Sequence, residues 1–262
     1  MVYFVSDLHL GTPSYAASRQ RELFFLQWLD TISSNATALY IVGDLFDFWF
    51  EYKNVVPKGF VRVLGKLAQM RDRGLPITVF VGNHDLWMSG YFEQELGIKV
   101  QHSPIITDIS GKRFFIGHGD GLGPNDMGYK LIKRYLFLNP VCRFLLQWLH
   151  PDIGIGIANY FSRRSRQHTG HDDDIFLGNE KEWLYCYALR KLQTAHYDYF
   201  IFGHRHLPLD IQLNPQSRYV NLGDWIKYFS YAVFDGQQLT LEYYRENIDL
   251  FLVKNKPKNT FK

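Results

Sequence analysis

Five short apolar runs, each ending in polar residues, constrain the fold of this chain more than any other feature. They cover residues 2–5, 39–42, 77–81, 114–116 and 199–202. Bulky residues without alternation are typical of strands buried on both faces. Helical patterns over 18–32 and 59–73 separate the first three runs. The order is therefore β-α-β-α-β, which predicts an α/β protein built in layers.

The chain becomes all-β after His204. Strands are expected over 209–213, 218–222, 231–234 and 239–243, with Asp235-Gly236 as a hairpin turn before the last of them. We expect these strands to form a second sheet that packs on the first.

The segment 126–194 interrupts the strand series and is predicted to be an inserted helical cap. It is rich in aromatic residues and arginine, and residues 128–169 hold seven Lys or Arg against one acid, Asp152. Residues 1–125 and 195–250 would form the core domain, and 251–262 a basic C-terminal tail. The positive charge is thus concentrated on the insert, because the whole chain carries only +3.

Composition excludes several classes of protein. With 262 residues and 46% hydrophobic content, the chain buries a core without disulfides, and its two cysteines lie far apart in no metal-like spacing. A net charge of +3 is too small to indicate a nucleic-acid partner. No signal peptide is visible, and the apolar segment 131–149 contains Lys133, Arg134 and Arg143. We therefore expect a cytoplasmic protein.

Metal-type side chains follow each of the five apolar runs. They are Asp7 and His9, Asp44 and Asp47, Asn83 with His84 and Asp85, His118 with Asp120, and His204 with His206. The carboxyl ends of neighbouring strands converge on one crevice in α/β folds. Carboxylate, imidazole and amide oxygen together suit Mn²⁺, Fe²⁺ or Zn²⁺. A glycine directly before four of the clusters allows the tight turn that such a site needs.

These ordered motifs resemble those of the calcineurin-like metallophosphoesterases, namely DxH, GDxxD, GNHD/E, H and GHxH. The resemblance covers residues 7–206. It implies a four-layer αββα sandwich with two divalent metal ions. One ion would take Asp7, His9, Asp44 and His206, and the other Asp44, Asn83, His118 and His204, with Asp44 as the bridge. The resemblance also makes His84 the catalytic residue that faces the phosphate and Asp47 the partner that orients its ring.

This ligand set suits phosphoester hydrolysis. Two cations lower the pKa of a shared water and offset the charge that grows on the phosphate, while His84 donates to the leaving oxygen or stabilises that charge. Neutral imidazoles are required as ligands, so we expect activity to fall below about pH 6.

A narrower resemblance connects the chain to the UDP-2,3-diacylglucosamine hydrolases of lipid A synthesis. It depends on the position of the insert, on the run from His118 to Leu122, and on Asp126 followed by Tyr129. Those enzymes cleave the pyrophosphate bond of an acylated UDP-sugar to 2,3-diacylglucosamine 1-phosphate (lipid X) and UMP, typically with Mn²⁺. This narrower resemblance implies substrate contacts from Asp126 and Tyr129, and the pattern of the wider family adds Asn83 and His84 as expected contacts of the substrate phosphate.

The composition of the cap is compatible with a lipid substrate. Segments 135–141 and 144–149 are apolar and aromatic and lie among basic residues, as expected of a surface that holds acyl chains and sits peripherally on the inner membrane. The same pattern is also typical of an ordinary helical core. Arg163, Arg164 and Arg166 would pair with diphosphate oxygens, or they form a solvated face.

One residue departs from the narrower pattern. The lipid A hydrolases carry arginine after the asparagine of the GN motif, whereas this chain has His84, as the wider family does. The alternative is therefore a soluble metallophosphoesterase that acts on another nucleotide or small phosphoester. The short insert and the modest charge argue against a nuclease. A non-enzymatic scaffold would be expected to lose ligands, and all seven are present. The sequence does not indicate the oligomeric state.

Overall fold

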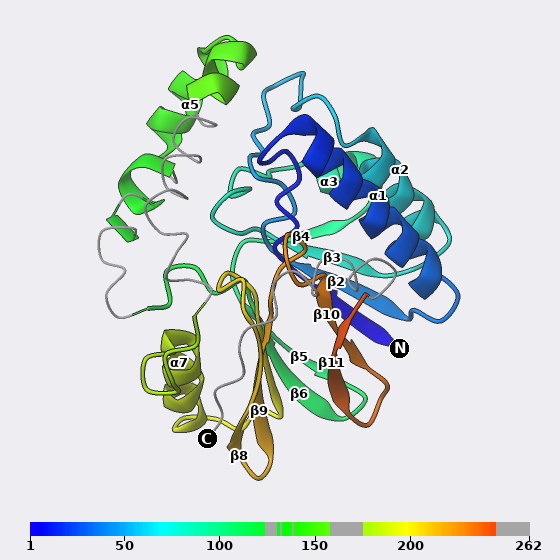
Figure 1. The fold of residues 1–262 in the computed structure, drawn as a ribbon. Coiled ribbons are helices and arrows are strands. Elements are labelled where there is room, and N and C mark those ends of the chain that lie inside the picture. Colours follow the sequence, from blue (N-terminus) through cyan, green and yellow to red (C-terminus); the bar gives the residue numbers. More distant parts are fainter. Residues whose placement is uncertain (124–129, 132, 138, 158–174, 245–262) are drawn as a thin grey trace.

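The computed structural model describes residues 1–123, 130–131, 133–137, 139–157 and 175–244. Two β-sheets pack face to face in the middle of the molecule, and helices cover their outer faces (Figure 1). This confirms the four-layer αββα architecture that the sequence resemblance implies.

The first sheet contains six strands in the order β11-β10-β1-β2-β3-β4. The strands are β1 (Val2–Val5), β2 (Ala38–Val42), β3 (Ile77–Phe80), β4 (Lys99–Gln101), β10 (Ser230–Phe234) and β11 (Leu239–Tyr243). Strands β1 to β4 are parallel, while β10 and β11 add antiparallel pairs beside β1. Strand β1 is buried along its whole length, as its unbroken apolar sequence predicts.

The second sheet has the order β5-β6-β7-β9-β8. Its strands are β5 (Ile105–Ile109), β6 (Lys112–Ile116), β7 (Tyr199–Phe202), β8 (Pro208–Asn214) and β9 (Ser217–Leu222). Strands β6, β7 and β9 are parallel, and β5 and β8 are antiparallel edges. The core between the two sheets contains Phe4, Phe114, Ile201 and Phe234, all buried.

Helices α1 (Tyr15–Ile32), α2 (Val61–Asp72) and α3 (Tyr91–Leu96) cover the first sheet. Residues Phe25, Trp28, Leu29 and Ile32 of α1 are buried at helical spacing, so one stripe of the helix faces the sheet. Ser14 caps the N-terminus of α1, because its hydroxyl accepts a hydrogen bond from the amide of Ala17.

The expectation that all four C-terminal strands form the second sheet is wrong for two of them. Strands β8 and β9 join β7, but β10 pairs antiparallel with β1 and thus extends the first sheet. The physical reason is the sharp turn after β9, where Trp225 donates its amide to the carbonyl of Asp7 and so brings the chain back to β1.

Helix α7 (Trp183–Leu192) packs on the second sheet through Leu184 and Ala188. It lies within the segment 126–194 that the sequence assigns to the cap, and we propose that the insert ends before Trp183. A π-helix, η1 (Lys133–Phe137), and α5 (Pro140–Trp148) come from the insert as well, and α5 stands apart from both sheets in Figure 1. Among the described residues, no helix combines the length and the apolar character that crossing a membrane requires.

Candidate metal centre

The predicted ligands lie on loops that leave the carboxyl ends of five strands. Asp7 and His9 follow β1, Asp44 follows β2, Asn83 follows β3, His118 follows β6, and His204 and His206 follow β7. Backbone hydrogen bonds join neighbouring loops: His9 donates its amide to Asp44, and Gly203 donates to His118. Both sheets therefore contribute to one site, and all seven predicted ligands meet there.

Five of these seven residues adopt the left-handed backbone conformation that non-glycine residues rarely occupy. Their φ angles are 56° at Asp7, 44° at His9, 51° at Asp44, 68° at His204 and 54° at His206. Such conformations cost free energy and persist only where the surrounding structure enforces them. Because these residues lie together, we infer that the loops keep unfavourable backbone conformations that orient the side chains toward one another.

The first half of the centre is formed by Asp7, His9 and His206. The Nε2 atoms of both histidines lie 3.5 Å from Asp7 Oδ1 and 3.2 Å from each other. Asp7 Oδ1 is buried and has no hydrogen-bond partner among the described residues. A buried carboxylate oxygen without a donor is costly, and a cation at this point would satisfy it.

The second half contains Asp44, Asn83, His118 and His204. The Oδ1 atom of Asn83 lies 2.9 Å from His204 Nδ1 and 3.3 Å from His118 Nε2. Asp44 Oδ2 lies 3.2 Å from His118 Nε2 and 3.6 Å from His9 Nε2. A single oxygen of Asp44 thus faces both halves, which is the geometry of a bridging ligand.

Glycines allow the ligand side chains to approach one another. A Cβ atom at Gly43 would collide with the ring of His118, one at Gly82 with the carboxylate of Asp44, and one at Gly203 with Ser6 and Asp7. The glycines of the GD, GN and GH motifs are therefore required for space, and Gly43 also needs its positive φ of 89°.

The ionisable side chains of the centre shift one another's pKa values. Burial disfavours the imidazolium forms of His9 and His118, but the carboxylates, above all Asp47 beside His9 and Asp44 beside His118, raise the pKa of both histidines to about 10. Burial, followed by the charge of His118, lowers the pKa of His204 to about 4. Burial works against ionisation of Asp44, yet the histidines hold its pKa well below the usual range. Ionised carboxylates are thus built into the buried site.

His84 and Asp47 lie at the rim of the centre. The Nδ1 atom of His84 donates to the backbone carbonyl of Asp47 at 3.0 Å, and the Asp47 carboxylate lies farther away at 3.7 Å. The same carboxylate oxygen is 3.6 Å from His9 Nδ1. The backbone of Asp47, more than its carboxylate, therefore sets the orientation of the His84 ring.

Two further carboxylates are buried against the centre: Asp85, which the sequence groups with Asn83 and His84, and Asp224, which lies outside the five motifs. Asp85 accepts hydrogen bonds from the amides of Gly82 at 2.7 Å and Leu45 at 2.8 Å, which joins the loops after β2 and β3. Asp224 Oδ2 lies 3.2 Å from His206 Nδ1. Gly223-Asp224 follows β9 as Gly43-Asp44 follows β2, and that repeated strand-Gly-Asp pattern is the signal that marks it.

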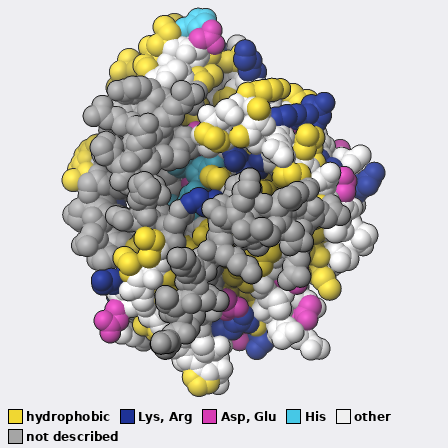
Figure 2. Space-filling view, in the orientation of Figure 1, with side chains coloured by type: hydrophobic (Ala, Val, Ile, Leu, Met, Phe, Trp, Pro, Cys, Tyr) yellow, Lys and Arg dark blue, Asp and Glu magenta, His cyan; other side chains and the backbone are white. Residues whose placement is uncertain are grey.

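Among the described residues, contacts join the predicted insert to the core beside the centre. Lys133 of η1 pairs with Asp120 at 2.5 Å, and the indole N–H of Trp87 donates to the carbonyl of Phe137 at 2.8 Å. A small cavity of about 50 Å³ lies there, lined by His118, His102 and Lys133 among others. Figure 2 shows histidine side chains at the floor of a hollow on this face. Asp126, Tyr129, Arg163, Arg164 and Arg166 lie outside the described residues.

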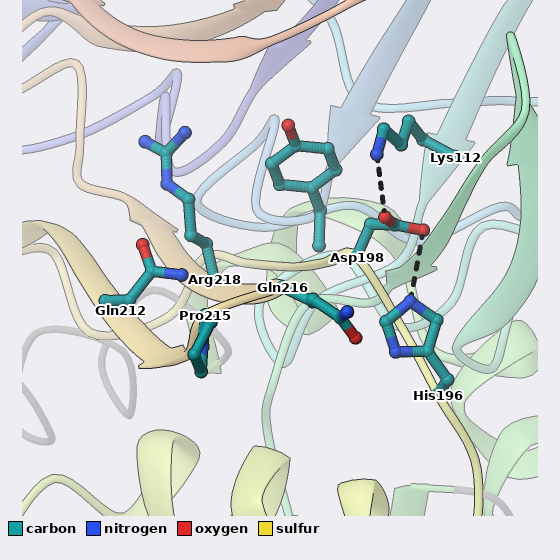
Figure 3. Close-up of a pocket in the computed structure, with 8 residues that line it drawn as sticks. Lys112, His196, Asp198, Gln212, Pro215, Gln216 and Arg218 are labelled. Carbon is teal, nitrogen blue, oxygen red and sulfur yellow. Dashed lines mark hydrogen bonds and ion pairs between the residues drawn. The ribbon is translucent and has the colours of Figure 1, made fainter.

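A larger surface hollow of about 530 Å³ lies at the opposite ends of the second-sheet strands (Figure 3). Its charged side chains have partners: Lys112 pairs with Asp198 at 3.1 Å, His196 lies 3.6 Å from the same carboxylate, and Arg218 pairs with Asp210. It holds none of the predicted site residues.

Comparisons with known proteins show the family to which this chain is similar. Residues 1–208 match the calcineurin-like phosphoesterase family. The UDP-2,3-diacylglucosamine hydrolase of Porphyromonas gingivalis is 41% identical over 261 residues, covering 92% of this chain and 96% of that protein. The UDP-2,3-diacylglucosamine hydrolase of Pseudomonas entomophila is 30% identical over 234 residues, covering 86% and 91%. The solved structure of YfcE, a phosphoesterase from E. coli, aligns with a TM-score of 0.44 and 17% identity over 91% of this chain and 90% of that chain.

Proposed function

The chain belongs to the calcineurin-like phosphoesterase family, and on that premise we propose that it is a two-metal hydrolase of UDP-2,3-diacylglucosamine. The reaction breaks the pyrophosphate bond and releases 2,3-diacylglucosamine 1-phosphate and UMP. The observation that carries the proposal is the 41% identity, over nearly the whole of both chains, to a protein named for this activity. The overlapping groups of buried and half-buried donors, which Asn83 joins through its contacts with His118 and His204, support it.

The residues present fit a pair of divalent ions. Asp7, His9, Asp44 and His206 would hold one ion, and Asp44, Asn83, His118 and His204 the other. The mixture of oxygen and nitrogen donors suits Mn²⁺, with Fe²⁺ and Zn²⁺ as alternatives. Bound divalent ions lower the pKa of a coordinated water and offset charge on phosphate oxygens. The unpartnered Oδ1 atom of Asp7 is the observation that favours an ion in the first half.

His84 is positioned to contact the substrate phosphate. Its Nδ1 atom donates to the carbonyl of Asp47, so the nitrogen on the other side of the ring, Nε2, would meet the phosphate. A proton passes from Nε2 to a leaving oxygen only when both ring nitrogens are protonated. Burial lowers the pKa of His84, and the negative charge of a bound pyrophosphate would oppose that effect.

Helix α5 supports a lipid substrate and a peripheral position on an anionic membrane. Its residues Val141, Phe144, Leu145 and Trp148 are exposed and recur at helical spacing, so they form one apolar stripe. Arg143 lies on the same helix. An apolar stripe beside basic side chains is typical of helices that lie in a bilayer interface. We propose that this stripe meets acyl chains, either of the substrate or of the surrounding lipid.

The activity test is UMP release from UDP-2,3-diacylglucosamine with added Mn²⁺. UDP-N-acetylglucosamine, which lacks the two acyl chains, and bis(p-nitrophenyl) phosphate serve as comparison substrates. Turnover of the acylated substrate that exceeds both comparisons supports the proposal. Hydrolysis of the simple diester without turnover of the acylated substrate would instead identify a soluble metallophosphoesterase for another nucleotide or small phosphoester, the reading that His84 favours.

The membrane proposal is tested by co-sedimentation with phosphatidylglycerol vesicles. We expect the wild type to sediment with the vesicles and the double variant Phe144→Ser, Trp148→Ser to remain in the supernatant. Tyr15→Ser is the matched control, because Tyr15 is an exposed aromatic residue of α1, outside the segment 126–194. Equal sedimentation of all three proteins would reject a role for the α5 stripe.

A further inference from the structure

Asp224 is a buried carboxylate that contacts the candidate metal centre without belonging to its ligand set. Its exposed fraction is 1%, and it lies in the turn that follows β9. Its Oδ2 atom lies 3.2 Å from His206 Nδ1. None of the five motifs includes it, because it comes 18 positions after His206 in the sequence.

The other oxygen of Asp224 is held by the backbone of its own turn. Oδ1 accepts hydrogen bonds from the amides of Lys227 at 2.8 Å and of Ile226 and Tyr228 at 3.2 Å. Three donors on one oxygen leave the carboxylate little freedom to rotate. Oδ2 is therefore held at the place where it meets the imidazole of His206.

This contact decides which nitrogen of His206 faces the centre. A carboxylate oxygen accepts hydrogen bonds, so His206 Nδ1 carries the hydrogen and the lone pair of the neutral ring lies on Nε2. Nε2 is the atom 3.5 Å from Asp7 Oδ1 and 3.2 Å from His9 Nε2. Without Asp224, the neutral ring would be able to place its hydrogen on Nε2, where it blocks metal binding.

The turn that carries Asp224 is also attached to the loops of the centre. The amide of Trp225 donates to the carbonyl of Asp7 at 3.1 Å. Just before the turn, the side chain of Asn221 donates to the carbonyl of Gly203 at 2.6 Å. Asp224 is thus placed relative to both Asp7 and the loop of His206, so it can set the distance between these two predicted ligands.

We propose that Asp224 is a positioning residue that holds His206 as the Nδ1–H tautomer and aims its Nε2 at the ion shared with Asp7 and His9. The proposal rests on the two-metal centre of the proposed function, but not on the identity of the substrate. Carboxylates that orient metal-bound histidines change metal affinity by about 10–100-fold when they are removed. We expect a loss of this size at one of the two ion sites.

The first test measures Mn²⁺ binding by the electron paramagnetic resonance signal of the free ion, without substrate. Asp224→Ser retains a hydroxyl that caps the turn amides and lacks the second oxygen that reaches His206. We expect this variant to bind one Mn²⁺ about 10–100-fold more weakly than the wild type and the other with unchanged affinity. Asp224→Asn keeps the size of the side chain and should show the same weakened site.

Asp210→Asn is the matched control. It also removes one carboxylate charge, but Asp210 pairs with Arg218 on the surface of the second sheet. Its two Mn²⁺ affinities should equal those of the wild type. Wild-type affinities at both ion sites in Asp224→Ser and Asp224→Asn would overturn the proposal. A wild type that binds Mn²⁺ at neither site would overturn the metal centre itself, and UMP release remains a separate measurement.

The second test needs no metal, and its decisive measurement uses the wild type. Nitrogen-15 NMR of the histidine rings reports the tautomer of His206 in the metal-free wild type at an alkaline pH where the ring is neutral. We expect the Nδ1–H form for His206, and Asp224→Ser should shift the ring toward Nε2–H. An Nε2–H ring in the wild type would refute the proposal even if both variants failed to fold.

Discussion

Replacement of Gly82 by alanine is the sharpest perturbation that the structure offers at the bridging ligand. A Cβ atom on Gly82 would lie 2.6 Å from Asp44 Cγ and 2.8 Å from the amide nitrogen of Asp44. Ordinary van der Waals contact begins near 3.4 Å. The Asp44 carboxylate must therefore move by about 0.8 Å or more, and the backbone nitrogen of Asp44, two residues after the end of β2, must shift as well.

The magnitude follows from these distances. Overpacking of a filled interior costs about 1–3 kcal/mol of unfolding free energy. A displacement of about 1 Å at a reacting centre costs roughly 100-fold in rate. We expect Gly82→Ala to lose about 1–3 kcal/mol of stability in the metal-free protein and roughly 100-fold in kcat/KM for UMP release with Mn²⁺.

Gly65→Ala is the matched control for this variant. Gly65 is exposed on α2, and a Cβ atom there meets nothing within 4 Å. Alanine at this position should raise the unfolding free energy by about 0.5–1 kcal/mol, because it favours the helix, and should leave turnover unchanged. Urea denaturation and the UMP assay measure both variants. A Gly82→Ala protein with wild-type turnover and Mn²⁺ affinity would refute the assignment of Asp44 as the bridge.

Four further predictions concern residues of the centre. Asp44→Ala should abolish turnover, and retained turnover would contradict the assignment of Asp44 as a shared ligand. His84→Ala should keep two bound Mn²⁺ ions, measured by metal analysis, and lose about 100-fold in kcat. The pKa of His9 and of His118 is about 10 in the metal-free protein, above the ordinary 6.5, so both rings carry protons at neutral pH. Mn²⁺ must displace those protons, so its affinity should rise with pH between 6 and 9, and calorimetry in weak buffer should detect proton release on binding. An affinity that does not depend on pH would contradict the assignment of these residues as ligands. The same raised pKa values stabilise the metal-free fold below pH 6.5, and that stability should fall as the pH rises toward 10 in thermal melts with chelator. Asp85→Ala leaves the amides of Gly82 and Leu45 without their acceptor, which costs about 1–3 kcal/mol of unfolding free energy each. The variant should therefore have a lower denaturation midpoint. Added Mn²⁺ should not restore that midpoint as it would for an ordinary surface variant.

Local sequence was informative where a strand runs directly into its functional residue. The apolar run 2–5 predicts β1, and Asp7 and His9 follow it at once. Unbroken apolar residues form a buried strand wherever they pack, so the polar residues after them must lie at the strand's carboxyl end. The candidate ligands could be predicted for this reason, although the distances between them could not.

The assignment of strands to sheets was not visible. The pattern of Tyr231–Phe234 fits an antiparallel strand of either sheet, and only the turn from Asp224 to Phe229 directs it to β1. The same limit applies to α7. Its amphipathic sequence predicts a helix with one apolar face, but whether that face meets the insert or the second sheet depends on Phe115 and Phe200, which lie far away in the chain.

The layered α/β class, the five strands that precede the predicted ligands and the chemistry of those side chains were thus contained in the sequence alone, because they depend on neighbours along the chain. The short strands β4 and β5 were not predicted. Tertiary structure alone decided that Asp224 meets His206, that Asp85 joins two loops, and that one oxygen of Asp44 faces both halves of the centre. These contacts join residues that are 18 or more positions apart, and their distances are set by how two sheets pack, which no local pattern encodes.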